Sequence, residues 1–536
     1  MSIARKQLAM PLVIAGSAGA GAIYAYVAGE DINWDWQNYH EYAGVALVQG
    51  RFDVDAAPGG FQSFLNPLIY LLPYLLRHGL PAPWWGLALG ALHGLNLALI
   101  WWVTRVLLGR TADAVTMTAA VTIAAFSPMA LSEVGTSFAD ILTAIPILAG
   151  VGLIFSDDDE LGRRFVLAGL LIGAATGLKL TNATFLIGAG VSLLLVARPL
   201  RAILAFAAGS AIAGVVTAGP WALKMARDFG SPLYPFYNSI FRSPDAPLGS
   251  IADTRFMPQG VLDALAYPFY WAIGRHPSSE SPFRDPRFAV VILLLMAVIV
   301  TGLWQRREVL SLRDRRFIVF GWVSYALWMQ AFSIQRYLIP LELLSAPLIV
   351  LLLARLIDAW RERDAPAAPS RSVQAVTVAG ALAIALASQP SDWTRRPWSD
   401  PYRPRLAEAL QQPAAFLLLH KPLGYLVPLL PAGSRFYQLS EIVVPIAPGG
   451  VLDRRIRSGL SEPLPGGIWA LYFANSRADY PPRLELLADY DLRIDESRPC
   501  EHVPGVDGTD IMACPVVPGA ISAAPTAGLK PGSRAD

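Results

Sequence analysis

Charged residues and cysteines are scarce in this sequence of 536 residues. Charged residues make up 16% of it, compared with roughly 25% in soluble domains. Hydrophobic residues make up 54%, and the mean hydropathy is +0.42. This composition indicates a membrane protein. The formal net charge of +2 gives no support for the strongly basic surface that nucleic-acid binding requires.

Sequence motifs for metals and soluble nucleotides are also missing. The six histidines and two cysteines form no HExxH or CxxC spacing. No glycine-rich loop that could cradle a nucleotide phosphate is present. The sequence therefore gives no support for soluble-nucleotide chemistry.

What the sequence has instead is a series of long apolar segments. Arg5 and Lys6 precede the first one, which we interpret as a retained helix because no clear signal-peptidase site precedes Asp31. We expect an all-α polytopic membrane domain over residues 1–389, with about eleven transmembrane helices. The segments lie at residues 8–28, 84–107, 113–131, 139–155, 164–178, 181–197, 201–221, 286–304, 316–332, 337–357 and 372–389.

Arginine residues in the short loops predict the orientation. With the N-terminus in the cytoplasm, the arginine-rich short loops all lie on the inner side, among them the loop with Arg306 and Arg313. The short outer turns then hold only Lys179 and Arg336. The bias predicts a multi-pass protein of a bacterial inner (plasma) membrane, with its C-terminal part in the periplasm.

Two long loops fall on the outer side, at residues 29–83 and 222–285. In the first, residues 36–49 carry aromatic and apolar side chains on one helical face, which predicts a helix lying in the membrane interface. Residues 64–77 are apolar but contain two prolines, and they predict a second juxtamembrane or re-entrant helix. The second loop is rich in proline and aromatic residues, and we expect an ordered surface loop there.

The character of the sequence changes after residue 389. Residues 390–517 mix turns with short β-like runs, which predicts a small extracytoplasmic α/β domain. The tail at 518–536 is rich in alanine, proline and glycine, and we expect it to be disordered. Cys500 and Cys514 lie in this domain, outside the cytoplasm, where a disulfide is favoured over two unrelated thiols. Their loop of about 15 residues would contribute ~3 kcal/mol in the loop-entropy model.

Acidic residues of the first outer loop are candidates for a catalytic base. Asp35 lies just before the predicted helix, with His40 a possible supporting residue. Asp35 has a competing role as a helix N-cap, which would lower its pKa and weaken it as a base. Asp31 is the alternative base, or a partner whose charge raises the pKa of Asp35.

Asp140 is a further acid on the same predicted side. It lies where one apolar segment ends and the next begins, so that it is either functional or a helix cap. Glu133 precedes it by seven residues, and we expect Glu133 to be solvated.

Two cations in short outer turns are candidates for binding a phosphate. Lys179 either extends toward lipid headgroups or anchors an anionic lipid phosphate, with Thr181 and Asn182 as partners. Arg336, followed by Tyr337, carries a guanidinium that matches phosphate geometry. The alternative for Arg336 is a simple ion pair with Glu342.

The order of these features resembles the GT-C membrane glycosyltransferases, which include protein mannosyltransferases and the aminoarabinose transferases of lipid A. The resemblance covers roughly residues 8–357, and each motif is weak by itself. The motifs are Asp35-Trp-Gln-Asn-Tyr39 through Gly50-Arg51, Asn66-Pro-Leu68, Ala139-Asp140-Ile141, the Gly-Leu-Lys-Leu-Thr turn at 177–181, Gly230-Ser-Pro-Leu-Tyr-Pro-Phe236 and Gln335-Arg-Tyr337.

The resemblance implies transfer of a sugar from a polyprenyl phosphate, with inversion at the sugar. Asp35 would take a proton from an unknown acceptor, and Asp140 would orient that acceptor. Lys179 and Arg336 would hold the phosphate. Many relatives carry two adjacent acids in the first loop, whereas Trp36 follows Asp35 here. A divalent metal therefore has no support from the sequence, although the resemblance leaves one open.

Two other classes compete with this interpretation. A transporter or flippase would place polar residues near the membrane midplane in repeated halves, whereas here they gather on one side without a repeat. A glycan polymerase or ligase would use a diphosphate-linked donor, and the arginine-rich second loop keeps that alternative open. Those arginines are Arg227, Arg242, Arg255, Arg275, Arg284 and Arg287.

Overall fold

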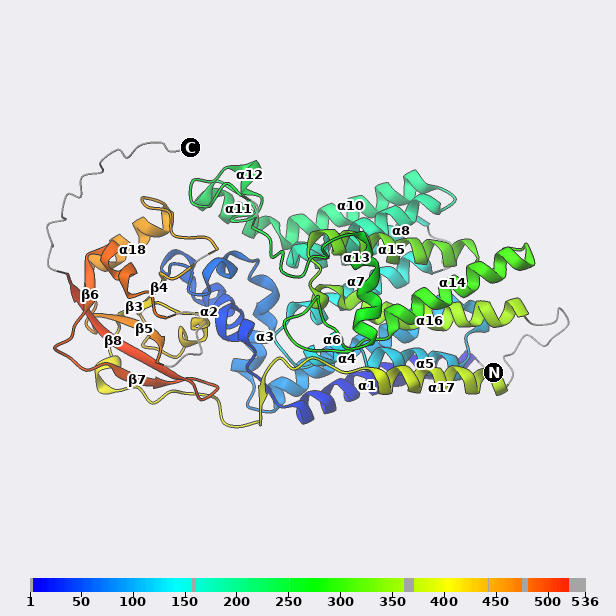
Figure 1. Ribbon diagram of the computed structural model, residues 1–536, viewed down its shortest axis with the longest axis horizontal. Helices are drawn as coiled ribbons and strands as arrows, with labels where there is room; N and C mark the ends of the chain where they lie inside the picture. The colour runs from blue at the N-terminus through cyan, green and yellow to red at the C-terminus, as the bar shows by residue number, and fades with distance from the viewer. Residues whose placement is uncertain are drawn as a thin grey trace, which may run out of the picture.

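A helical bundle and a β-sheet domain lie end to end in the computed structural model (Figure 1). The structure describes residues 3–156, 161–249, 251–360, 371–441, 443–474 and 481–519. Most of the predicted tail at 518–536 lies outside these residues. The first outer loop, with helices α2 and α3, lies between the bundle and the sheet (Figure 1).

The bundle contains a helix in each of the eleven predicted segments. The principal helices are α1 (Ile3–Ala28), α4 (Trp84–Leu108), α5 (Ala114–Ala125), α6 (Pro128–Glu133), α7 (Ala139–Phe155), α8 (Leu161–Leu178), α9 (Ala183–Ser192), α10 (Pro199–Thr217), α14 (Arg287–Gln305), α15 (Leu312–Ala331), α16 (Ile339–Trp360) and α17 (Arg371–Ala387). The second outer loop adds the short helices α11 (Gly219–Phe229), α12 (Asn238–Phe241) and α13 (Val261–Ala272).

Five helical segments in the described residues are long and apolar enough to cross a membrane. They are Met10–Ala28, Trp84–Leu108, Pro199–Thr217, Arg287–Gln305 and Gln335–Trp360. Several others are shorter apolar helices. The single span predicted at 113–131 is wrong: α5 ends at Ala125, and α6 begins at Pro128. Proline lacks the N–H of an ordinary residue and so starts a new helix more readily than it continues one.

Small residues allow the helices to pack closely. Gly169 and Gly173 lie four residues apart on α8, and both face Ser210 on α10. A Cβ added at Gly169 would lie 2.1 Å from the carbonyl oxygen of Phe206. Lipid does not drive apolar helices together, so that close backbone approach of this kind is a main source of their association.

The first outer loop differs from the predicted surface helix. It begins as a π-helical turn, η1 (Trp36–His40), and continues as α2 (Glu41–Gln49). Every residue from Trp36 to Ala46 is buried, and this includes the polar ones. A helix with one face in lipid and one in water is therefore the wrong description. The second predicted helix of the loop is present as α3 (Leu68–Gly79).

The C-terminal domain is built on a mixed sheet, as the prediction of an α/β domain requires. Its strand order is β4 (Arg435–Gln438), β3 (Ala415–Leu418), β5 (Ile468–Phe473), β8 (Asp510–Pro518) and β6 (Leu492–Ile494), with β7 (Glu501–Pro504) also paired to β8. Strands β4, β3 and β5 are parallel, and β8 is antiparallel to β5. Helix α18 (Val451–Ser461) contributes Leu452 and Ile456 to the core on one side of the sheet.

The sheet shares its hydrophobic core with the first outer loop. Phe416 and Trp469 of the sheet join Trp36, Tyr42 and Val45 of the loop in one buried cluster. A two-stranded pairing of β1 (Glu30–Asp31) with β2 (Arg395–Arg396) ties the residues after α1 to those after α17. The C-terminal domain is thus in direct contact with the helical turn that carries Asp35.

A tight contact at Gly424 offers a test of this coupling. A Cβ added at Gly424 would lie 2.0 Å from the carbonyl oxygen of Asn38 in η1. We expect Gly424→Ala to displace η1 and to lower the free energy of unfolding by about 1–3 kcal/mol, the usual cost of overpacking. Gly214→Ala is the control, because nothing lies within 4 Å of its added Cβ. Equal thermal stability of the two variants in detergent would contradict the prediction.

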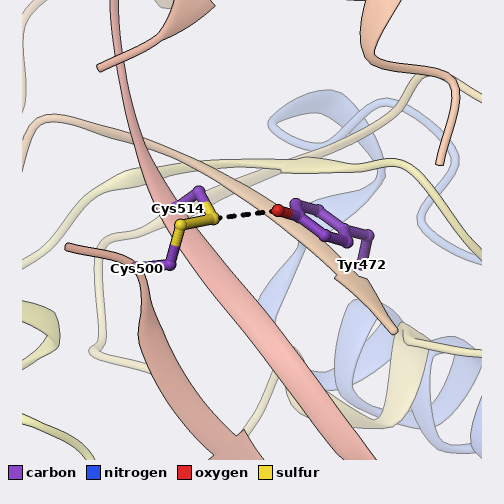
Figure 2. Close-up of a disulfide and its surroundings, with 3 residues drawn as sticks. All are labelled: Tyr472, Cys500 and Cys514. Atoms are coloured by element: carbon purple, nitrogen blue, oxygen red, sulfur yellow. Dashed lines mark hydrogen bonds between the residues drawn. A yellow bond between two sulfur atoms is a disulfide. The ribbon is translucent and has the colours of Figure 1, made fainter. Parts of the chain in front are cut away.

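The predicted disulfide is present between Cys500 and Cys514. Cys514 lies in β8 and Cys500 just before β7, and the hydroxyl of Tyr472 is 3.0 Å from the Cys514 sulfur (Figure 2). The two cysteines are 14 residues apart in sequence.

We expect Cys500→Ser with Cys514→Ser to lower the free energy of unfolding by about 2–4 kcal/mol, because the bond restricts the unfolded chain. Denaturant unfolding of the protein in detergent would measure the loss. Tyr472→Phe is the control, because it removes the hydroxyl contact but keeps the disulfide. A loss no larger than that of the control would refute the stabilising role.

Candidate functional site

The π-helical turn η1 sets the directions of the first-loop side chains. In a π-helix the backbone bonds residue i to residue i+5, and the Glu41 N–H donates to the Trp36 carbonyl in this way. The indole of Trp36 accordingly donates to Glu41 Oε2 at 2.9 Å. Asp35 and His40 are separated by the same five residues, so that they lie near one another along this turn.

Asp35 pairs with Arg336, which lies 301 residues further along the chain. Asp35 makes no side-chain cap bond, although it occupies the N-cap position of η1. Burial raises the pKa of the Asp35 carboxyl, but the charge and the hydrogen bond of Arg336, together with the charge of Lys179, outweigh this effect and hold the pKa below its ordinary value. The competing role of helix cap is therefore wrong.

Lys179 pairs in the same way with Asp140. Lys179 Nζ lies 2.6 Å from Asp140 Oδ1, and the lysine side chain is 16% exposed. The lysine is thus not extended toward lipid headgroups. Asp140 lies in the first turn of α7, where it could have capped the helix. Its hydrogen bond goes to Lys179 instead.

Tyr337 joins the two ion pairs. Its ring lies 4.5 Å from Lys179 Nζ and 5.4 Å from the Arg336 guanidinium carbon. The ring of Phe138 also lies near Arg336, 5.2 Å from the guanidinium carbon. The Tyr337 ring therefore lies between the Asp35–Arg336 pair and the Asp140–Lys179 pair. We refer to Asp35, Asp140, Lys179, Arg336 and Tyr337 as the charged cluster.

Asp31 lies beside this cluster and holds the local backbone in place. Its Oδ1 accepts two bonds from Asn33, and its Oδ2 accepts the N–H and the hydroxyl of Ser137 at 2.8 and 2.9 Å. These four bonds commit both carboxylate oxygens of Asp31 to Asn33 and Ser137. The side-chain amide of Asn182 donates to the Ala175 carbonyl near the end of α8.

His40 lies next to the cluster and is fully enclosed. Its Nδ1 lies 2.8 Å from the Ser137 hydroxyl, and its ring stacks on Tyr70 at 4.3 Å. Within the described residues, its Nε2 has no hydrogen-bond partner. Burial lowers the pKa of His40 to about 3, although the charges of Asp35 and Asp31 act in the opposite direction.

Glu133 and Ser137 are site residues that the sequence interpretation missed. Glu133 is fully buried, so the prediction that it is solvated is wrong. Burial and the charge of Asp140 raise its pKa well above the ordinary value. The Ile141 N–H donates to its Oε2 at 3.2 Å. Both residues lie close to Asp140 in the sequence, but the partners of Ser137, which are Asp31 and His40, come from the first outer loop.

Glu342 does not pair with Arg336. It pairs at 2.6 Å with Arg287, which is fully buried and also binds Asp285 at 2.7 Å. The Met129 and Ala130 N–H groups donate to the same Glu342 carboxylate. This network joins α6, α14 and α16. It also shows that one second-loop arginine, Arg287, is committed to internal contacts.

An apolar groove runs along the bundle beside the start of α16. It lies between α13, α14, α15 and α16. Pro268, Phe288, Phe320, Leu341 and Leu348 are among its lining residues. Leu341, near the start of α16, lies only five residues after Arg336. The groove therefore approaches the charged cluster at the start of this helix.

Comparisons with known proteins give one family match and one structural match that bear on the fold. A family model described as Glycosyltransferase family 87 matches residues 64–323, just under half of the chain. In fold, the chain is similar to ArnT from Cupriavidus metallidurans, whose crystal structure is bound to undecaprenyl phosphate. The TM-score is 0.53 with 11% sequence identity, over 96% of this chain and 98% of that one. The chain has the GT-C fold.

The GT-C fold and the family match together indicate a multi-pass membrane glycosyltransferase. The matched region contains Asp140 and Lys179, whereas Asp35 and Arg336 lie outside it. No curated protein sequence matches the chain significantly. In the part of the chain that the structure describes, no three His, Cys, Asp or Glu side chains form a group suited to a metal ion.

Proposed function

We propose that this protein transfers a sugar from a polyprenyl-phosphate donor to a hydroxyl of an extracytoplasmic acceptor, with inversion at the sugar. The observation that carries the proposal is the meeting of Lys179 and Arg336 at the Tyr337 ring, with a carboxylate on each cation. Two cations from distant segments suit a phosphate that must be bound and then stabilised as it leaves.

The donor phosphate would compete with the two carboxylates for the cations. Binding of the phosphate by Arg336 loosens its pair with Asp35, and binding by Lys179 loosens its pair with Asp140. Asp35 is a weak base while the guanidinium holds it, because the pair favours the charged form. The donor therefore prepares the base by drawing Arg336 away from it.

The reaction then proceeds as a single displacement. The acceptor oxygen attacks the anomeric carbon, and Asp35 takes the hydroxyl proton. The bond from that carbon to the phosphate oxygen breaks, and the phosphate keeps the electron pair beside Lys179 and Arg336. Attack from the side opposite the phosphate inverts the sugar configuration. Asp140, released from Lys179, orients the acceptor.

The apolar groove beside α16 suits the polyprenyl chain. Its lining is almost wholly hydrocarbon and aromatic, and each buried CH₂ of a lipid contributes about 0.8 kcal/mol. The groove ends near Arg336, so a chain lying in it could present its phosphate to the charged cluster. We place the cluster and residues 390–517 on the periplasmic side of a bacterial inner membrane, since the loop arginines favour a cytoplasmic N-terminus.

The test uses membranes that contain the protein and undecaprenyl phosphate carrying a radiolabelled hexose or pentose. We expect the wild type to remove label from the lipid and Lys179→Met to lose this activity. Lys224→Met is the matched control, because Lys224 pairs with Asp53 and Asp228 away from the cluster. Consumption of a diphosphate-linked oligosaccharide instead would favour the polymerase or ligase class, and no consumption would oppose both.

A further inference from the structure

Glu133 is a buried acid that the proposed reaction does not use. It is completely enclosed, with 0% of its surface exposed. Its Oε2 accepts the Ile141 N–H at 3.2 Å, whereas its Oε1 has no hydrogen-bond partner among the described residues. Leaving a buried carboxyl oxygen without a partner is costly, so the oxygen calls for a proton or a ligand.

Asp140 has a matching oxygen at the same end of α7. Its Oδ1 is bonded to Lys179 Nζ at 2.6 Å, and its Oδ2 has no partner in the part of the chain that the structure describes. The Ile141 N–H that bonds to Glu133 belongs to the residue directly after Asp140. Both carboxyl groups therefore lie at the first turn of α7. Among the charges that act on Glu133, that of Asp140 is the largest.

The backbone on both sides of Glu133 is held in place by an arginine from β2. The Arg395 guanidinium donates to the carbonyls of Ser132 and Val134 at 2.8 and 2.7 Å. With the chain held on both sides and Oε2 bonded to α7, the Glu133 carboxyl group has little freedom to turn away from Asp140.

We propose that Glu133 carries a proton and shares it with Asp140, between the two oxygens that otherwise have no partner. One O–H group satisfies both oxygens, because a protonated carboxyl donates and a carboxylate accepts. Glu133 is then a positioning residue, which keeps Asp140 paired when the donor phosphate draws Lys179 away. This positioning role rests on the proposed function, whereas the shared proton does not.

The balance of charges favours the protonated form of Glu133. Burial, and after it the charge of Asp140, raise the pKa of Glu133 well above its ordinary value, although Lys179 and Arg336 act in the opposite direction. A phosphate that binds these two cations adds negative charge and strengthens the hold on the proton. An ionised Glu133 would instead repel Asp140 at the moment when Asp140 loses its cation, and a buried charge without a partner is strongly destabilising.

Infrared spectroscopy of the detergent-solubilised protein tests the proton directly. The band of a protonated carboxyl group should be present in the wild type at neutral pH and should be weakened in Glu133→Gln. Asp53→Asn is the matched control and should leave the band unchanged, because the Asp53 carboxylate is exposed and pairs with Lys224. A band of wild-type intensity in Glu133→Gln would overturn the inference. This measurement needs no donor lipid.

Binding of undecaprenyl phosphate tests the positioning role. Glu133→Leu removes the proton donor, so that Lys179 becomes harder to draw away from Asp140. Affinity in a detergent titration should fall by about 10-fold to 100-fold, the effect expected for a hydrogen bond to a charged group. Glu133→Gln should recover most of this loss, because its amide can accept the Ile141 N–H and donate to Asp140.

Two further variants separate this role from the loss of a helix cap. Asp113→Leu removes the carboxylate that caps α5 and should keep the wild-type affinity. In an Asp140→Asn background, Glu133→Leu should have almost no further effect, because a neutral amide does not need a proton donor. A full additional loss of affinity in that background would overturn the positioning role. So would a Glu133→Gln variant that binds no better than Glu133→Leu.

Failure of the proposed function gives a different set of results. If the wild type neither binds undecaprenyl phosphate nor consumes a sugar linked to it, the proposed function and the positioning role are both wrong. The infrared band then still decides whether Glu133 carries a proton. If the wild type transfers sugar but Glu133→Leu keeps the wild-type affinity, the proposed function stands and the positioning role is wrong.

Discussion

Replacing Arg336 with methionine should lower sugar transfer from a polyprenyl-phosphate donor by about 10²–10³-fold, the usual cost of losing one group that stabilises developing negative charge. The leaving phosphate would keep only Lys179. Asp35 would also lose its partner inside a largely buried site, where an unpaired charge is costly. Single-turnover transfer of labelled sugar in detergent measures the effect separately from donor binding.

The same substitution should change the pH dependence. Burial acts to raise the pKa of Asp35, and Arg336 is the first of the charges that lower it. Without Arg336 the pKa rises, and a base is active only above its pKa. The acid limb of the rate profile should therefore move to higher pH in Arg336→Met. Arg255→Met is the control, since Arg255 is 69% exposed and pairs with Asp253. An unchanged acid limb would argue against Asp35 as the base.

Arg336→Lys should be intermediate between the wild type and Arg336→Met. Lysine keeps the charge but loses the planar fork that grips a phosphate through two bonds. If Arg336→Lys transfers as fast as the wild type, charge alone is enough and the guanidinium geometry has no role.

The sequence pattern predicts the bundle far better than it predicts the site's internal contacts. Helices such as α4 and α14 follow from local composition, because a membrane span requires apolar residues in sequence. The charged cluster is different, since its pairs join residues 301 and 39 positions apart. The predicted topology places these polar residues at the outer ends of the helices. No local sequence pattern predicts which acid forms an ion pair with which cation.

The first outer loop shows the same limit. The face carrying Trp36 and Tyr39 predicts a helix, and a helix is present, but the inferred lipid-facing surface is wrong. Its polar residues find partners elsewhere: His40 contacts Ser137, and the Asn38 amide donates to the Gly59 carbonyl. Amphipathic patterning assumes that polar side chains face water. It fails where other segments of the chain cover the helix and supply the hydrogen bonds.

Asp35→Asn should reduce sugar transfer by about 10²–10⁴-fold, the usual contribution of a general base. The amide is nearly the same size as the carboxyl group but cannot take the acceptor proton. Binding of undecaprenyl phosphate should become tighter in the same variant, because Arg336 would no longer be held by a carboxylate. Transfer is measured with labelled donor, and affinity by titration of undecaprenyl phosphate in detergent.

The opposite signs of these two effects distinguish a base from a purely structural acid. If Asp35 only positioned Arg336, its loss would weaken phosphate binding together with transfer. Asp53→Asn provides the matched control in the same loop, because Asp53 is 69% exposed and pairs with Lys224. Asp31→Asn should instead destabilise the fold, since Asp31 accepts bonds from Asn33 and Ser137. If Asp35 is a base that the donor releases from Arg336, Asp35→Asn should combine slower transfer with tighter lipid binding. A purely structural acid would not give this combination.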